Sequence, residues 1–389
     1  MKKLNKLVAI LVAMAMILSL GIISAFAADV NETGKAYFTK TWDAPEGVKT
    51  PAQTFSFTVV QDKEAGVNNT ATIQGQNISY AAEETGTKSS TDLLAGQTWK
   101  DANDKVVPGV YVYTVKETIP DAAVDNKVVE TVKTNNDKTT TTKTTTYSDK
   151  TYTMKVYVDK NGNVTGVVVT EEGQDQKKTS DEPTTGEDGK VQANGFNFRN
   201  TYSEKVENTP NGTIPDEPGD KDGASAYVEK KVTAENEALI DDNQEFGFST
   251  TVTFPEIDPA DSYTAKIVKA DGTSAGKADV VFTKAEPTKT YNLKNGERLV
   301  FTNIDLGATY TATETTKAID GYTYKSGEVT DPETITAAKN GAQIINNYDK
   351  ATTPEGILIS NLPYIALALV AIGGLVAYVV VRRRNADEA

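Results

Sequence analysis

The sequence predicts an all-β protein with two tandem domains, and three features indicate this. Apolar and polar residues alternate over short stretches such as residues 54–59 and 246–254, which is the period of a strand with one buried face. Asn-Gly and Asp-Gly pairs follow several of these stretches and are typical of hairpin turns. No helical periodicity appears between the termini, and a segment rich in Pro, Gly, Asp and Asn near 204–224 has the composition of a linker.

The N-terminus has the features of a secretory signal. Three lysines precede an apolar run, which closes with small residues at Ala25 and Ala27, so we expect cleavage before Ala28. An uncleaved membrane helix is the less favoured alternative. The expected organisation is a signal peptide at 1–27, a first domain at 28–203, a linker at 204–224, a second domain at 225–350 and a C-terminal segment at 351–389.

The C-terminal segment predicts a membrane anchor. The stretch 363–381 is uncharged and long enough for a spanning helix, which takes roughly 20 residues. Arginines at 382–384 follow it and would stay on the cytoplasmic side. The span is preceded by a short polar motif formed by Thr353, Pro354, Glu355 and Gly356.

Two hairpins and one polar tract are expected within the domains. Residues 154–158 and 164–169 are expected to pair across Asn161-Gly162, and residues 291–293 and 299–301 across Asn295-Gly296. The threonine-rich tract 139–146 is expected to be a polar edge strand or an insertion loop.

Composition excludes several classes of function. The chain has no Cys and no His, which excludes disulfides, thiol nucleophiles, Cys/His zinc sites and His-based triads. A net charge of −14 makes nucleic acid a poor partner. Residues 159–170 resemble a calcium loop, but Val164 stands where that loop needs Gly, so a hairpin turn is favoured. We expect no metal and no cofactor.

Both halves of the chain contain three similar segments in the same order. The first half has YFTKTW at 37–42, YVYTVKE at 111–117 and FNFRNTY at 196–202; the second has YVEKKV at 227–232, YTATE at 310–314 and IINNY at 344–348. Because alternate residues of a strand share a face, each half directs one Lys, one Glu and one Asn towards an apolar core. These residues are Lys40, Glu117 and Asn200, and then Lys230, Glu314 and Asn346.

Such a trio predicts chemistry because a lone buried charge is costly and must pair, neutralise or react. Burial favours a neutral amine and a protonated carboxyl group. The amine can then attack the Asn side-chain carbonyl while Glu polarises that carbonyl and moves protons, and ammonia leaves. The alternative is a buried salt bridge beside a hydrogen-bonded Asn. Repetition of the trio with correct parity favours the covalent amide.

These segments resemble the streptococcal T-antigen major-pilin family, and the likeness covers most of residues 34–350. The resemblance implies two immunoglobulin-like β-sandwich domains with autocatalytic isopeptide bonds. Carried over, the bonds are Lys40–Asn200 with Glu117 as catalyst, and Lys230–Asn346 with Glu314. Ile344 departs from the family, which usually has an aromatic residue there.

The C-terminus resembles a sortase sorting signal and implies cleavage between Glu355 and Gly356. The motif differs from Leu-Pro-x-Thr-Gly, since Glu355 stands in place of Thr; an uncleaved protein would stay tethered to the membrane. The resemblance implies a covalent homopolymer of pilin subunits, assembled by sortase and attached to peptidoglycan. Such assembly also needs a lysine that links one subunit to the next. Lys190 is the first candidate and Lys160 the second, although either could be an ordinary surface lysine.

The leading functional hypothesis is a pilus shaft subunit or a closely related structural cell-wall protein at the cell surface. The alternative is an adhesin that binds a host or matrix ligand on the same scaffold. A hydrolase is disfavoured because no multi-turnover site is visible without His or Cys. The single-turnover crosslinking is self-modification, so the chain is not expected to be an enzyme.

Overall fold

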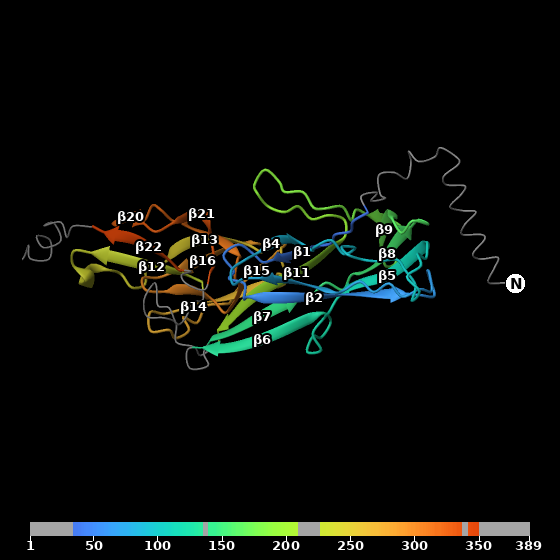
Figure 1. Cartoon of the computed structure of the whole chain (residues 1–389). Coiled ribbons are helices and arrows are strands. Elements are labelled where there is room, and N and C mark those ends of the chain that lie inside the picture. The colour runs from blue at the N-terminus through green and yellow to red at the C-terminus, as the bar shows by residue number, and fades with distance from the viewer. Residues whose placement is uncertain (1–33, 135–138, 209–225, 337–340, 350–389) are drawn as a thin grey trace, which may run out of the picture.

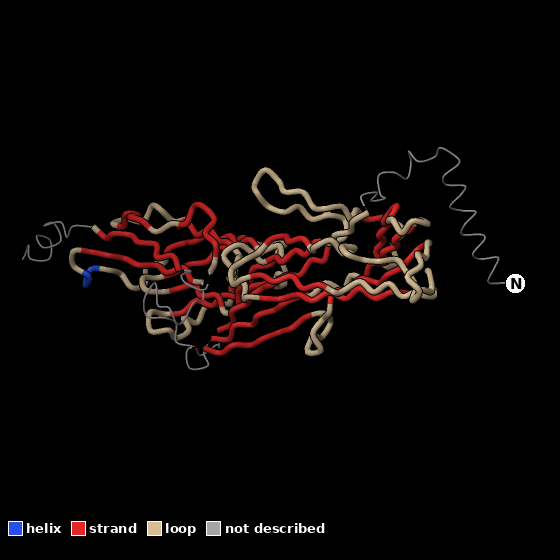
Figure 2. The backbone as a smooth tube through the Cα atoms, in the orientation of Figure 1, coloured by secondary structure: helices blue, strands red, loops and turns tan. Residues whose placement is uncertain are grey.

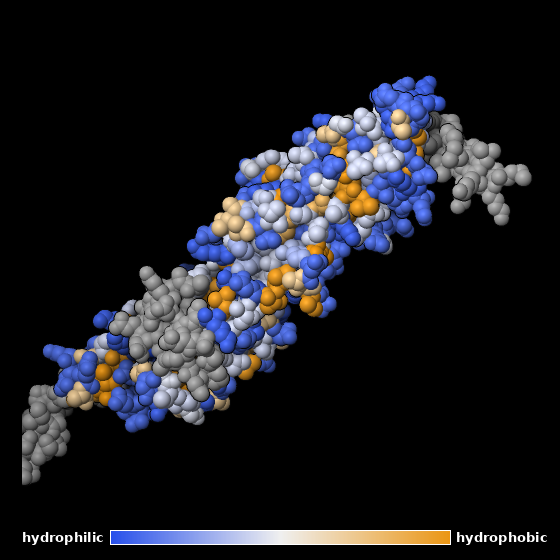
Figure 3. Space-filling view, turned by 60° about the horizontal axis from the view of Figure 1, so that its bottom comes forward, coloured by the Kyte–Doolittle hydropathy of each residue, from blue (hydrophilic) through white to orange (hydrophobic). Residues whose placement is uncertain are grey.

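The computed structural model of the chain describes residues 34–134, 139–208, 226–336 and 341–349. These residues form an all-β structure, as predicted, and the short 3-10 turn η2 (Glu237–Leu239) is the one helical element among them. The strands form four sheets along an elongated molecule (Figures 1 and 2). The face seen in Figure 3 is largely hydrophilic, with small scattered apolar patches.

Two sheets are formed by the first half of the chain, and they enclose one apolar core. Alternating residues such as Phe55 and Phe57 face Trp42 and Tyr113 there, all at most 2% exposed. One sheet contains, in spatial order, β4 (Gly86–Ser89), β1 (Thr39–Asp43), β11 (Asn197–Asn208), β7 (Thr139–Thr146) and β6 (Lys127–Thr134). The other contains β10 (Lys177–Lys178), β9 (Val164–Glu171), β8 (Thr151–Val158), β5 (Gly109–Glu117), β2 (Gln53–Asp62) and β3 (Gln76–Tyr80).

The second half forms another pair of sheets around a separate core. Phe246, Phe248 and Phe301 are fully buried in it. One sheet contains, in spatial order, β15 (Val280–Thr283), β14 (Ser262–Val268), β17 (Arg298–Phe301), β12 (Tyr227–Ala234), β22 (Gly341–Tyr348) and β20 (Tyr322–Ser326). The other contains β16 (Thr288–Leu293), β13 (Phe246–Thr253), β19 (Thr309–Glu314) and β21 (Val329–Thr334).

Strand β11 connects the two halves directly. Its last part pairs antiparallel with β18 (Asn303–Asp305), and Val206 is buried in the second core. Residues 204–208, which the sequence assigned to the linker, are therefore strand. Backbone pairing and burial of Val206 outweigh the polar composition of this segment. Residues 209–224, the remainder of the expected linker, lie outside the described residues.

One expected hairpin is confirmed and the other is wrong. Strands β8 and β9 pair across the turn that contains Gly162, which has a φ of +85° that glycine adopts without strain. Strands β16 and β17 do not pair: β16 pairs with β13 and β17 with β12 and β14. The Asn295-Gly296 turn therefore takes the chain from one sheet to the other, and Asn295 Oδ1 accepts a bond from Val232 N.

The threonine tract is strand β7, but it is an inner strand and not the expected edge. It lies between β11 and β6, and β6 forms the edge. The prediction was wrong because it relied on the polarity of the side chains. Both faces of β7 are partly exposed, so this inner strand does not show an alternation of apolar and polar residues. The expected signal and membrane segments lie outside the described residues, and no described helix is long and apolar enough to cross a membrane.

Candidate functional site

In each half of the chain the first strand of one sheet lies beside the last strand, and the two run parallel. Lys40 of β1 lies opposite the residue two places before Asn200 of β11. Lys230 of β12 lies opposite the residue two places before Asn346 of β22. Because residues two apart share a face, each lysine projects into its core beside its asparagine. The same register in both halves gives two equivalent sites.

The first trio is completed by Glu117 at the end of β5, in the facing sheet. Lys40 Nζ donates a hydrogen bond to Glu117 Oε2 at 2.9 Å, and Asn200 Nδ2 donates one to Glu117 Oε1 at 2.6 Å. The side chains of Lys40 and Glu117 are both 0% exposed. One carboxyl group therefore contacts the amine and the amide across the core.

The second trio repeats this arrangement. Glu314, at the end of β19, accepts a bond from Lys230 Nζ on Oε2 at 2.8 Å and one from Asn346 Nδ2 on Oε1 at 2.8 Å. The side chains of Lys230 and Glu314 are also 0% exposed. The structure thus brings together all six residues that the strand parity directed inward, as two trios with matching contacts.

Burial shifts the pKa values of the two lysines and of Glu117. It lowers the pKa of Lys40 to about 8, although the ion pair with Glu117 acts in the opposite direction. Burial likewise lowers the pKa of Lys230 and raises the pKa of Glu117. Aromatic rings enclose both amines, with Lys40 Nζ 4.2 Å from the Phe55 ring centroid and Lys230 Nζ 4.1 Å from that of Phe246. Burial thus makes the lysine proton easier to remove in both trios and makes Glu117 a better proton acceptor in the first, and loss of that proton gives the amine a lone pair for attack.

The amide oxygens of the two asparagines have different surroundings. Asn200 Oδ1 accepts a hydrogen bond from the backbone N–H of Ser148 at 2.7 Å. Because a backbone N–H can only donate, this bond fixes Oδ1 towards Ser148 and Nδ2 towards Glu117. The expected contact of Glu117 with the carbonyl oxygen is therefore absent in this geometry. Asn346 Oδ1 accepts no hydrogen bond from the described residues.

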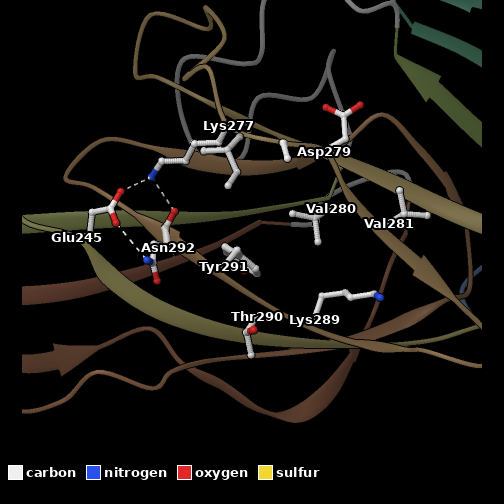
Figure 4. Close-up of a pocket in the computed structure, with 11 residues that line it drawn as sticks. Glu245, Lys277, Asp279, Val280, Val281, Lys289, Thr290, Tyr291 and Asn292 are labelled. Carbon is white, nitrogen blue, oxygen red and sulfur yellow. Dashed lines mark hydrogen bonds and ion pairs between the residues drawn. The ribbon is translucent and has the colours of Figure 1, made fainter.

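A third Lys–Glu–Asn trio lies at the surface of the second half, beside an open groove (Figure 4). Glu245 Oε1 lies 3.0 Å from Lys277 Nζ, and Glu245 Oε2 accepts a bond from Asn292 Nδ2 at 3.1 Å. Lys277 also donates to Glu297 Oε2 at 2.9 Å and to the backbone oxygen of Asn292. No pattern in the sequence points to this trio, because its members lie outside the segments that the two halves share.

Exposure separates this surface trio from the two buried ones. The side chains of Lys277 and Glu245 are 24% and 41% exposed. The bond to Lys277 lowers the pKa of Glu245. Partial burial alone would lower the pKa of Lys277, but its bonds to Glu297 and Glu245 outweigh this and raise it. Both groups therefore stay charged, and an ammonium has no lone pair with which to attack Asn292.

The two candidate linking lysines are both exposed. Lys190 lies in a hairpin of the 178–196 segment, which protrudes from the first half as the yellow-green loop of Figure 1. Its carbonyl oxygen accepts a bond from Gly186 N at 2.8 Å, and its own N–H donates to Asp188 Oδ1 at 3.1 Å. Lys160 lies in the turn between β8 and β9. The motif at 353–356 lies outside the described residues.

Comparison of the sequence with known proteins gives two matches. Residues 226–348 match a family described as a domain of unknown function, DUF7601. The chain is also 28% identical over 180 residues to a pilin of Streptococcus pyogenes serotype M1, which covers 42% of this chain and 50% of that protein. The chain thus matches about half the length of this relative.

Solved structures of streptococcal pilus proteins align with most of the chain at low similarity. The major pilin T3.2 of S. pyogenes is 21% identical, with a TM-score of 0.31, over 82% of this chain and 100% of that one. The pilus-presented adhesin Cpa is 10% identical, with a TM-score of 0.25, over 81% and 100%. Scores this low do not show a common fold. On the sequence homology, this chain is related to the Gram-positive pilins.

Proposed function

We propose that this chain is a shaft subunit of a surface pilus, and that each half is an immunoglobulin-like β-sandwich domain locked by a Lys–Asn isopeptide bond. The observation that carries the proposal is the repeated trio: in both halves, a buried Glu contacts a buried Lys and an Asn on adjacent parallel strands. The homology to a streptococcal pilin supports the class of protein.

The reaction follows from the contacts in the first trio. Lys40 Nζ, as a neutral amine, forms a bond to Asn200 Cγ, and the Cγ–Nδ2 bond breaks. Glu117 accepts the proton from Nζ on Oε2 and supplies one to Nδ2 from Oε1, so that ammonia leaves and Glu117 is regenerated. Asn200 Nδ2 can accept this proton only after Cγ has become tetrahedral, because the lone pair of an amide nitrogen is delocalised into the carbonyl group. The product is a neutral amide, which removes the buried charge.

The position of the bonds suits a protein that carries tension. Lys40 and Asn200 lie on adjacent parallel strands, as do Lys230 and Asn346. Force that enters near one end of a half therefore passes through the covalent bond to the other end. The chain has no Cys, so these crosslinks take the place that disulfides hold in many exported proteins, and no reductant opens them.

Assembly is proposed to use the C-terminal motif and an exposed lysine. Sortase would cleave between Glu355 and Gly356 and transfer the acyl group to Lys190 of the next subunit, and finally to peptidoglycan. Lys190 is exposed in the 178–196 hairpin, so an enzyme can reach its amine. These steps place the protein at the cell surface, anchored through its C-terminus.

Cell-wall extracts of the native host are expected to contain a ladder of covalent oligomers of this chain that survives boiling in detergent. Lys190→Ala should abolish the ladder, while Lys160→Ala, at an equally exposed turn, should leave it intact. The measurement is an immunoblot of wall extracts from the two variant strains. A ladder that survives Lys190→Ala and disappears with Lys160→Ala assigns the link to Lys160, and monomer alone in the wild type contradicts a shaft subunit.

A further inference from the structure

We propose that the backbone N–H of Ser148 is the oxyanion donor of the first crosslinking reaction, so that the two bonds form by unequal chemistry. This inference rests on the proposed crosslinking. When the amine attacks Asn200 Cγ, negative charge develops on Oδ1, and the Ser148 N–H already lies 2.7 Å from that atom. A preorganised donor at the oxygen where charge develops is the usual means of stabilising a tetrahedral intermediate.

The fold holds this N–H in place through the preceding residue. Ser148 lies in the connection between β7 and β8, where the chain passes from one sheet to the other directly over Asn200. The preceding residue, Tyr147, donates its N–H to Asn126 O at 2.8 Å. The Tyr147 ring lies 6.0 Å from that of Phe55, which in turn lies 4.2 Å from Lys40 Nζ. Ser148 itself is 7% exposed, so water does not compete freely for the site.

The Ser148 bond also assigns separate tasks within the first trio. Because Oδ1 is held by Ser148, the bonds of Glu117 to the other two members of the trio go to their nitrogens. The Ser148 N–H also lies near Glu117: burial raises the pKa of Glu117, and this N–H acts in the opposite direction. Glu117 therefore transfers the proton from the attacking amine to the leaving ammonia, and the main chain stabilises the oxyanion. The reaction leaves the net charge of the core unchanged. Lys40 Nζ loses one proton as it bonds to Cγ, and that proton leaves with Nδ2 as part of ammonia.

The second trio has no such donor among the described residues. Asn346 Oδ1 is buried and accepts no hydrogen bond there, although Glu314 contacts Asn346 Nδ2 as Glu117 does in the first trio. Among the described residues no group is placed to stabilise charge on that oxygen, because Glu314 contacts the amide nitrogen instead. The Lys230–Asn346 bond is therefore expected to form more slowly than the Lys40–Asn200 bond after folding.

The test replaces one N–H with oxygen. In the full chain, lactic acid is incorporated at position 148 by nonsense suppression. This replaces the peptide bond between residues 147 and 148 with an ester, which has no N–H. The matched parent is Ser148→Ala, which has the same side chain and keeps the N–H. A second pair, lactic acid at 149 against Asp149→Ala, controls for an ester in the same loop. Chains recovered unfolded are diluted into folding buffer, and the crosslinked peptides of each half are measured by mass spectrometry of timed digests.

We expect the ester at 148 to slow the Lys40–Asn200 bond about 100-fold relative to Ser148→Ala, the usual effect of removing one oxyanion donor. The Lys230–Asn346 bond in the same molecules should keep its rate and report that the second half has folded. The ester at 149, in the same loop of the first half, should change neither bond. Equal rates for the ester at 148 and its parent would overturn the assignment. Wild-type chains that never form either bond would instead overturn the proposed crosslinking itself.

Discussion

When the wild-type chain is pulled from its two ends, the first half is expected to stay short, whereas the Asn200→Ala variant is expected to lengthen by roughly 550 Å more. The reason is the path of the force. With the isopeptide bond present, tension passes from Lys40 directly to Asn200, and the residues between them are never stretched. Without it, the whole intervening segment extends at roughly 3.3–3.6 Å per residue.

Single-molecule force spectroscopy measures this difference, and the chain offers its own controls. Asn346→Ala should release the segment between Lys230 and Asn346 in the second half, which is roughly 400 Å long by the same estimate, and leave the first half locked. Asn292→Ala, in the exposed surface trio, should release nothing. Unfolding of the wild-type first half to its full extended length would show that tension does not cross a covalent bond there.

Loss of the first crosslink is also expected to lower the free energy of unfolding of the first half by about 5 kcal/mol. A link between residues more than 100 apart restricts the unfolded chain, and the estimate follows the loop-entropy relation established for disulfides. Asn200→Ala is the suitable change because it removes the carboxamide that supplies the acyl group but keeps Glu117 beside Lys40. Glu117→Ala should cost several kcal/mol more, since it leaves a buried lysine without its partner.

The two tryptophans make this measurement specific to one half. Trp42 and Trp99 are both buried in the first core, at 0% and 4% exposed. Their fluorescence during guanidinium unfolding should report a transition at lower denaturant in Asn200→Ala than in the wild type. Asn346→Ala serves as the matched variant and should leave this transition unchanged. Coincident transitions in the wild type and Asn200→Ala would contradict a covalent link in the first half.

The direction of each buried polar side chain could be predicted from the sequence because it depends only on local alternation. Lys40, with apolar neighbours two residues away on either side, had to share their face, although Thr39 on the other face is buried as well. The same reasoning applies to Glu117 and Asn346. Parity alone was sufficient to identify all six members of the two trios.

Register and main-chain contacts could not be predicted in this way. The pairing of Lys40 opposite the residue two before Asn200 depends on how distant strands dock. The Ser148 N–H has no side-chain signature, and any residue except proline would supply it. For the same reason the Asn295-Gly296 turn looked like a hairpin, although the chain changes sheets there. Glu245, Lys277 and Asn292 meet only because two loop residues converge on strand β16, which carries Asn292.

The most direct test of the crosslinks is the mass of the folded chain. We measure the intact mass of the purified wild type, with its terminal residues fixed by peptide mapping, beside Glu117→Ala and Glu314→Ala. The account predicts a wild-type mass short by two ammonia molecules, not three, with one restored by each substitution. A wild-type chain at its full calculated mass would leave two buried salt bridges in their place and contradict the account.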